Sequence, residues 1–207
     1  MPSSLVEHVS ETESELSSIT YFKNVVNFLK SRNIENVLDV GGCTGQVSVL
    51  LIHSIPTIKK ITILEPVREN YEFICERAKE ADTVEIEVIN KALFYGEEYI
   101  QLGRCDSNVG GWSFRHQNNQ TDSVKTITLE EFSNVDFAKI DIEGAESNVV
   151  PNSTYIKEIP YIEIEFHDEL YVTWGDFINE HLNSHQVMFE GSPDRPQNVF
   201  LVRKDLL

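Results

Sequence analysis

A glycine-rich turn near the start of the chain has the composition of a ligand-binding loop. Residues 39–45 read Asp-Val-Gly-Gly-Cys-Thr-Gly and lie between a strand predicted over 36–40 and a helix predicted over 47–55. Glycines permit a tight turn and let a ligand lie against bare backbone, and the N-terminus of the following helix supplies unpaired N–H donors. Asp39, at the end of the strand, could meet a cationic group of that ligand.

Glu65 strengthens this interpretation, because it ends the next predicted strand 20 residues beyond Gly45. An acid at that place in a βαβ unit can accept hydrogen bonds from both hydroxyls of a ribose. The dinucleotide fingerprint GxGxxG fails here, since Cys43 and Gln46 stand where it needs glycines after Gly41. We therefore favour a ribose-containing ligand over a plain strand-to-helix turn, and a nicotinamide oxidoreductase is the less favoured alternative.

Two later apolar strands, predicted over 137–142 and 161–166, each carry charge on one face. Alternation along a strand places these charged residues on one side: Lys139, Asp141, Glu163, Glu165 and His167. Burying an unpaired charge is costly, so these groups must be paired or face a cleft. We expect Lys139 to pair with Glu163 or Glu165.

Asp141 and His167 lie nearer the strand ends, where a substrate crevice is expected, and are the candidate catalytic proton acceptors. Asp141 could instead cap the helix that starts near Gly144, and a strand-end histidine is often only a satisfied polar residue. A hard divalent ion such as Mg²⁺ is a further possibility. Its candidate ligands are Asp141, Glu165 and His167, with Asp168 beside them, although their spacing does not identify a metal.

Glu143 and Glu146 follow Asp141 at a predicted helix N-terminus, where the helix dipole favours anions. We expect Glu146 to stabilise the helix locally, whereas Glu143 could help to bind a cation.

The elements that must position these residues alternate between strands and helices. The strands expected in the sheet cover 36–40, 60–65, 83–90, 137–142, 161–166, 187–190 and 198–202, and the last two form an antiparallel pair. This order predicts an α/β, Rossmann-like fold with a mostly parallel seven-stranded sheet and an antiparallel C-terminal strand. Residues 94–134 are less regular and contain only short candidate strands.

Composition limits the partners. The 207 residues fit one domain over 17–207 after an acidic flexible tail over 1–16, and the net charge is −17. That charge argues against nucleic acid and anionic membranes as partners, and a neutral or cationic ligand is easier to reconcile with it. Three cysteines without CxxC spacing, and no signal peptide or membrane span, indicate a cytoplasmic protein. The oligomeric state is open.

The motifs resemble those of a known family. The turn DVGGCTG followed by Glu65 resembles the first motifs of class I S-adenosylmethionine-dependent methyltransferases. The segment VDFAKIDIEGAE, over 135–146, resembles the hallmark of the FkbM family within that class, and VKTITLEEF and IEIEFH fit the same family. The resemblance spans residues 35–168.

This resemblance implies S-adenosylmethionine as cofactor and O-methylation of a hydroxyl on a sugar, glycolipid or secondary metabolite. The residues that it places at the cofactor are Asp39, Gly41, Gly42, Cys43, Gly45, Glu65, Asn90 and Ala92. The chain departs from the family pattern at VVPNS, over 149–153, where a glycine is usual, and at Glu130–Glu131, where an aspartate is common. A noncatalytic nucleoside-binding module is the alternative that keeps the fold.

Overall fold

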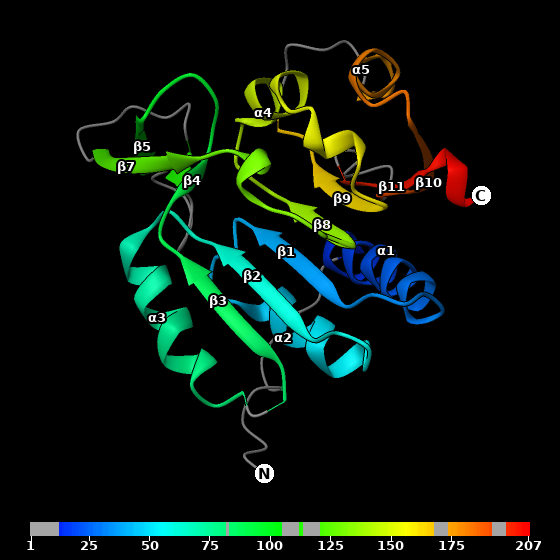
Figure 1. The fold of residues 1–207 in the computed structure, drawn as a ribbon, viewed down its shortest axis with the longest axis horizontal. Helices are drawn as coiled ribbons and strands as arrows, with labels where there is room; N and C mark the ends of the chain where they lie inside the picture. The colour runs from blue at the N-terminus through cyan, green and yellow to red at the C-terminus, as the bar shows by residue number, and fades with distance from the viewer. Residues whose placement is uncertain (1–12, 82, 105–111, 114–120, 168–173, 192–197) are drawn as a thin grey trace.

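The centre of the molecule is a seven-stranded sheet (Figure 1). The structure is a computed structural model, and it describes residues 13–81, 83–104, 112–113, 121–167, 174–191 and 198–207. Its strand order is β10-β11-β9-β8-β1-β2-β3. The strands are β1 (Asn36–Val40), β2 (Lys60–Leu64), β3 (Glu85–Ile89), β8 (Phe137–Ile140), β9 (Tyr161–Glu165), β10 (His185–Glu190) and β11 (Asn198–Arg203). The pairs among β9, β8, β1, β2 and β3 are parallel, whereas β11 runs antiparallel to both β9 and β10. The predicted Rossmann-like fold with an antiparallel C-terminal strand is therefore confirmed.

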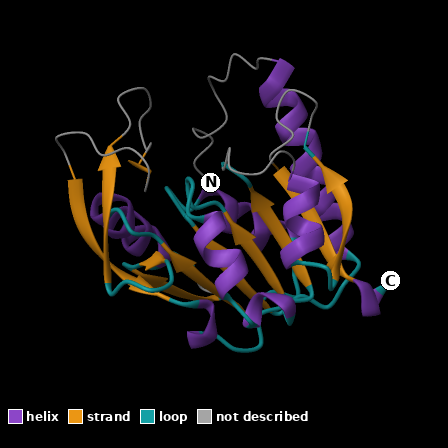
Figure 2. Ribbon diagram, turned by 90° about the horizontal axis from the view of Figure 1, so that it is seen from above, coloured by secondary structure: helices purple, strands orange, loops and turns teal. Residues whose placement is uncertain are grey.

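Helices cover both faces of this sheet (Figure 2). They are α1 (Glu13–Lys30), α2 (Gln46–Ser54), α3 (Arg68–Ala78), α4 (Glu146–Asn152) and α5 (Trp174–His181). Successive residues of a strand face opposite sides, so Val37 packs with α1, α2 and α3 whereas Leu38 packs with α4 and α5. No helix in the described ranges is long and apolar enough to cross a membrane.

A second, smaller sheet lies beside the main one, at the upper left of Figure 1. Its strands are β4 (Ala92–Leu93), β5 (Tyr99–Arg104), β6 (Trp112–Ser113) and β7 (Thr121–Ile127), in the order β4-β7-β5-β6. It occupies the connection from β3 to β8. The sequence predicted short strands here but not their pairing into a sheet, because the pattern within a strand does not identify its partner.

Helix α1 begins inside the segment that was expected to be a tail. Residues 13–16 are helical, and residues 1–12 lie outside the described part of the chain. Cys43 is an exposed free thiol and Cys75 a half-buried one, while Cys105 falls outside the described residues.

Candidate functional site

The glycine turn is held tightly against the neighbouring strand ends. Gly41 has a φ of +81°, and a Cβ atom built there would lie 1.8 Å from the carbonyl oxygen of Asp141. A Cβ on Gly42 would lie 2.3 Å from Cγ2 of Ile63. Gly45 has a φ of +74° and precedes α2. Packing within the chain therefore requires the first two glycines, and Gly41 brings the turn into contact with the residue after β8.

Asp39, in β1, is fully buried beneath this turn. Ser48 donates a hydrogen bond from Oγ to Oδ2 of Asp39 at 2.6 Å, whereas Oδ1 has no hydrogen-bond partner among the described residues. Burial raises the pKa of Asp39, and the nearby positive charge of Lys139 opposes that rise. One carboxyl oxygen of Asp39 is therefore hydrogen-bonded, and the other has no hydrogen-bond partner among the described residues.

Glu65 follows β2 and is anchored by main-chain groups. The N–H of Cys43 donates to Oε2 at 2.7 Å, and the N–H of Val67 donates to Oε1 at 2.8 Å. Burial nonetheless raises the pKa of Glu65 to about 7. The side chain is 3 % exposed, so these two bonds fix its position between the turn and α3.

Asn90 follows β3 and completes this row of strand ends. Its Nδ2 donates to the carbonyl oxygens of Glu65 and Pro66, at 2.8 and 2.9 Å. Ala92 starts β4 and is buried in a cluster with Ala145, close to the beginning of α4. The residues that the family resemblance places at the cofactor therefore follow one another along the carboxyl edge of the main sheet.

The next two strands bring the charged residues together. Nζ of Lys139 lies 3.1 Å from Oδ2 of Asp141, so its ion pair is with Asp141 and not, as expected, with Glu163 or Glu165. Glu163 lies opposite Lys139 on β9 and interacts with it only through a longer-range Coulomb attraction. Residues two apart on a strand share a face, and the long lysine side chain reaches along its own strand. Asn198 of β11 instead donates from Nδ2 to both glutamates, at 3.2 and 3.1 Å.

Asp141 does not cap α4. The N-cap residue is Ala145, without a side-chain hydrogen bond, and Glu143 and Gly144 before it have positive φ angles of 51° and 102°. The side chain of Asp141 is turned to Lys139, and the favourable Coulomb interaction with Asp141 raises the pKa of Lys139 against the opposing effect of burial.

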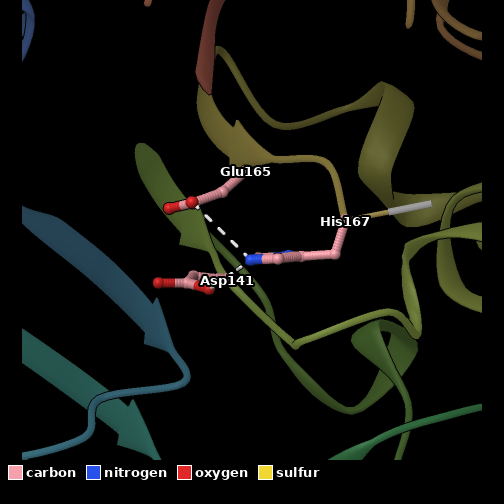
Figure 3. Close-up of side chains that lie close together, drawn as sticks. All are labelled: Asp141, Glu165 and His167. Atoms are coloured by element: carbon pink, nitrogen blue, oxygen red, sulfur yellow. Dashed lines mark ion pairs between the residues drawn. The ribbon is translucent and has the colours of Figure 1, made fainter. Parts of the chain in front are cut away.

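His167 lies at the centre of a ring of carboxylates. Its Nδ1 is 3.0 Å from Oε1 of Glu146, and its Nε2 is 3.6 Å from Oε1 of Glu165 and from Oε2 of Glu143, and 4.0 Å from Oδ1 of Asp141. Figure 3 shows three of these side chains converging from the ends of β8 and β9. Burial alone would lower the pKa of His167, but the hydrogen bond and charge of Glu146 and the other carboxylates raise it to about 9.

Three of the sequence-predicted residues thus meet. One ligand atom from each of Asp141, Glu165 and His167 lies within 4.8 Å of the other two. Asp168 is outside the described residues. The sequence did not indicate that Glu146, expected only to stabilise its helix, would be fully buried against His167, because the two residues are 21 positions apart.

One departure from the family pattern has a structural explanation away from this site. Oε1 of Glu130 accepts hydrogen bonds from the N–H groups of Thr154 and Tyr155 and from Oγ of Ser153. Although burial opposes the change, these bonds and that from Tyr95 lower the pKa of Glu130 to about 2. Glu130 therefore joins the exit of β7 to the turn that follows α4.

Comparison with solved structures places the fold among the Rossmann-like methyltransferases. The FkbM methyltransferase of Methylobacillus flagellatus has a TM-score of 0.58 at 18% identity, over 82% of this chain and 44% of that longer one. A Haemophilus influenzae protein assigned as a methylase has a TM-score of 0.54 at 13% identity, over 90% and 98% of the two chains. An rRNA methylase of Streptococcus thermophilus has a TM-score of 0.50 at 11% identity, over 88% and 96%.

At these identities the likeness shows the fold alone, that of a class I methyltransferase. A comparison with curated protein sequences found no significant match. The profile of the FkbM methyltransferase domain, however, matches residues 39–189, and the chain belongs to this family. This family is one of methyltransferases. Because the chain spans less than half of the Methylobacillus protein, that protein's full activity is not carried over.

Proposed function

We propose that this protein transfers the methyl group of S-adenosylmethionine to a hydroxyl oxygen of a small molecule or glycan. The observation that carries the proposal is the contact between Gly41 and the carbonyl of Asp141. The contact is made by the main chain of Asp141, and it supports the proposal because a residue with an ionisable side chain lies next to the predicted cofactor turn. An acceptor hydroxyl could then lose its proton next to the donor.

The residues along the edge fit such a cofactor. Each oxygen of Glu65 accepts one main-chain N–H, so the carboxylate keeps lone pairs for the two hydroxyls of a ribose. The unpartnered Oδ1 of buried Asp39 offers an acceptor near the turn, where the amino group of the methionine moiety would lie. Gly41, Gly42, Cys43 and Gly45 would then face the methionine moiety, and Asn90 and Ala92 the adenine.

Asp141 is the proposed base. S-adenosylmethionine supplies a methyl group that its sulfonium makes electrophilic. Asp141 would accept the hydroxyl proton as the acceptor oxygen bonds to the methyl carbon, and the electron pair of the broken carbon–sulfur bond would stay on sulfur. Such proton transfer contributes about 10²–10⁴-fold to a rate, and correct positioning contributes more.

His167 was the other candidate base. Without a bound cation, a pKa of about 9 keeps its ring protonated at neutral pH, so that it donates from both nitrogens. We therefore assign His167 to the positioning of Asp141 and the acceptor, and not to proton abstraction.

The acceptor class follows from charge. The site carries Asp141, Glu143, Glu146 and Glu165 around one imidazole, and the whole chain has a net charge of −17. A polyanionic acceptor such as RNA would be repelled. The rRNA methylase shares the fold at 11% identity, which gives no reason to expect its substrate here.

Calorimetry with S-adenosylmethionine, followed by an assay for S-adenosylhomocysteine release, tests the proposal. We expect saturable binding, and turnover with at least one hydroxylated glycoside, glycolipid or polyketide from an acceptor panel that also contains an RNA oligonucleotide and an amine. Absence of cofactor binding would refute the proposal. Binding without turnover, unaffected by Asp141→Asn, would favour the noncatalytic module, and binding of NAD instead would favour an oxidoreductase.

A further inference from the structure

We propose that Asp141, Glu165 and His167 are the protein ligands of a divalent transition-metal ion. This site deepens the proposed function and rests on it for the role of the ion, but not for its binding. The three residues are the group whose potential ligand atoms lie within 4.8 Å of one another.

The distances fit a shared ion after a small contraction. Nε2 of His167 is 3.6 Å from Oε1 of Glu165 and 4.0 Å from Oδ1 of Asp141. Ligand atoms about 2.0–2.2 Å from one ion stand roughly 3.0–3.6 Å apart. The two separations from His167 are too long for direct hydrogen bonds and up to about 0.4 Å too long for common ligation, while the carboxylate oxygens of Asp141 and Glu165 lie within 4.8 Å of each other.

Glu146 provides a second and independent indication. It is fully buried, although charged residues are rarely buried without a compensating charge, and its Oε2 has no hydrogen-bond partner among the described residues. Its Oε1 lies 3.0 Å from Nδ1 of His167. Metal-binding histidines characteristically donate their other ring N–H to a carboxylate, which fixes the ring and presents the free nitrogen to the metal. Glu146 thus aims Nε2 at the carboxylates of Asp141 and Glu165.

The charge balance also favours a cation. The four carboxylates of Asp141, Glu143, Glu146 and Glu165 approach one imidazole, while the ammonium of Lys139 pairs with Asp141. A divalent ion replaces the proton on Nε2 and adds one further positive charge in the same place.

The ligand types select the kind of metal. An imidazole with two carboxylates suits Mn²⁺, Fe²⁺, Co²⁺ or Zn²⁺, whereas Mg²⁺ prefers oxygen ligands and retains its water. The Mg²⁺ suggested by the sequence is therefore the less suitable ion. Three protein ligands leave coordination positions open, where an acceptor hydroxyl would bind and become more acidic. With the ion bound, this acidification would take the place of proton acceptance by Asp141. An acceptor with two neighbouring oxygens would fill two of these positions.

Binding of Mn²⁺ to the full chain, stripped with a chelator and kept free of S-adenosylmethionine, tests the site. We expect one Mn²⁺ per chain by calorimetry and electron paramagnetic resonance, and weaker binding of Mg²⁺. Glu165→Gln and His167→Gln should each raise the Kd for Mn²⁺ at least about tenfold, and Glu146→Gln about 10–100-fold. Glu98→Gln, just before β5, and His53→Gln, in α2, are the matched controls. Both side chains are exposed, and both variants should leave the Kd for Mn²⁺ unchanged.

Two results would overturn the metal site. One is an equal Kd for Mn²⁺ in Glu165→Gln and Glu98→Gln, with circular dichroism showing both folded. The other, which needs no variant, is a spectrum of the Mn²⁺-loaded wild-type protein without coupling to an imidazole nitrogen. Neither result bears on S-adenosylmethionine binding by the metal-free protein, so failure of the metal site and failure of the proposed function are distinguishable.

Discussion

The carboxyl edge of the main sheet has two halves that hold their polar side chains in different ways. In the cofactor half, at the ends of β1, β2 and β3, Glu65 accepts two main-chain N–H groups and Asn90 donates to two main-chain carbonyls. In the acceptor half, at the ends of β8 and β9, Asp141 and His167 are held by other charged side chains.

Under the proposed function, the first half would bind the cofactor and the second would carry out the chemistry. Main-chain partners are fixed by the fold, so the cofactor half is set once the sheet forms. Side-chain partners change with protonation or with a bound cation, so the acceptor half can respond to its ligands. Two residues join the halves: Gly41 touches the carbonyl of Asp141, and Lys139 interacts electrostatically with both Asp39 and Asp141.

The largest expected effect comes from Asp141→Asn in the acceptor half. Loss of the proposed base should lower kcat by about 10²–10⁴-fold. The affinity for S-adenosylmethionine should not change, because Asp141 belongs to the other half. Steady-state kinetics and calorimetry measure the two quantities. Asp122→Asn, on an exposed residue of β7, is the control, and an equal loss of kcat in both variants would contradict the assignment.

Lys139→Met tests the charge that joins the halves. Lys139 is 8 % exposed, and its removal leaves Asp39 and Glu163 buried without the cation that lowers their pKa values. Breaking a buried pair in this way should lower the free energy of unfolding by about 3–5 kcal/mol, as measured by urea denaturation. Lys79→Met, on an exposed residue after α3, should change it by less than about 0.5 kcal/mol. Similar values for both would show that Lys139 does not hold the halves together.

Glu65→Gln perturbs the cofactor half alone. The amide NH₂ would face a main-chain N–H, and the charge-assisted bonds to a ribose would be lost. We expect the Kd for S-adenosylmethionine to rise about tenfold to hundredfold, equivalent to roughly 1.5–3 kcal/mol. Affinity for Mn²⁺ should be unchanged. Glu69→Gln, in the first turn of α3, is the control, and retention of wild-type affinity in Glu65→Gln would remove Glu65 from the binding site.

The smallest expected effect is a pH dependence of cofactor binding. Glu65 has a pKa of about 7, so its ionised fraction rises from about one tenth at pH 6 to about nine tenths at pH 8, and affinity should rise by up to about tenfold. Between pH 4.5 and pH 7, Glu65 keeps its proton in the folded protein but has released it in the unfolded chain. The contribution of Glu65 to the free energy of unfolding therefore falls as pH rises through that window. Calorimetry at several pH values measures the first effect, and a profile unchanged in Glu65→Gln would assign it to another group.

Local sequence patterns predicted much of the main sheet and the order of its elements. The strands before the glycine turn and before Glu65 are apolar and lie within βα units, where the fold follows from local pattern and short connections. The pairing of β5, β6 and β7 into the small sheet was not predicted, because the pattern within a strand does not identify the strand beside it. The partner of Lys139 was predicted wrongly, because Asn198 had not been placed beside Glu163 and Glu165.

The sequence by itself determined the strand–turn–helix order, the acid that follows β2 and the single charged face of β8 and β9, since each depends on residues close together along the chain. Tertiary structure alone decided that Glu146 would orient His167 from 21 positions away. It also decided that residue 41 must be a glycine, because a side chain there would collide with the carbonyl of Asp141. Local periodicity states which way a side chain faces, but not which distant side chain it will meet. That choice depends on the register and packing of strands and helices that the chain brings together only when it folds.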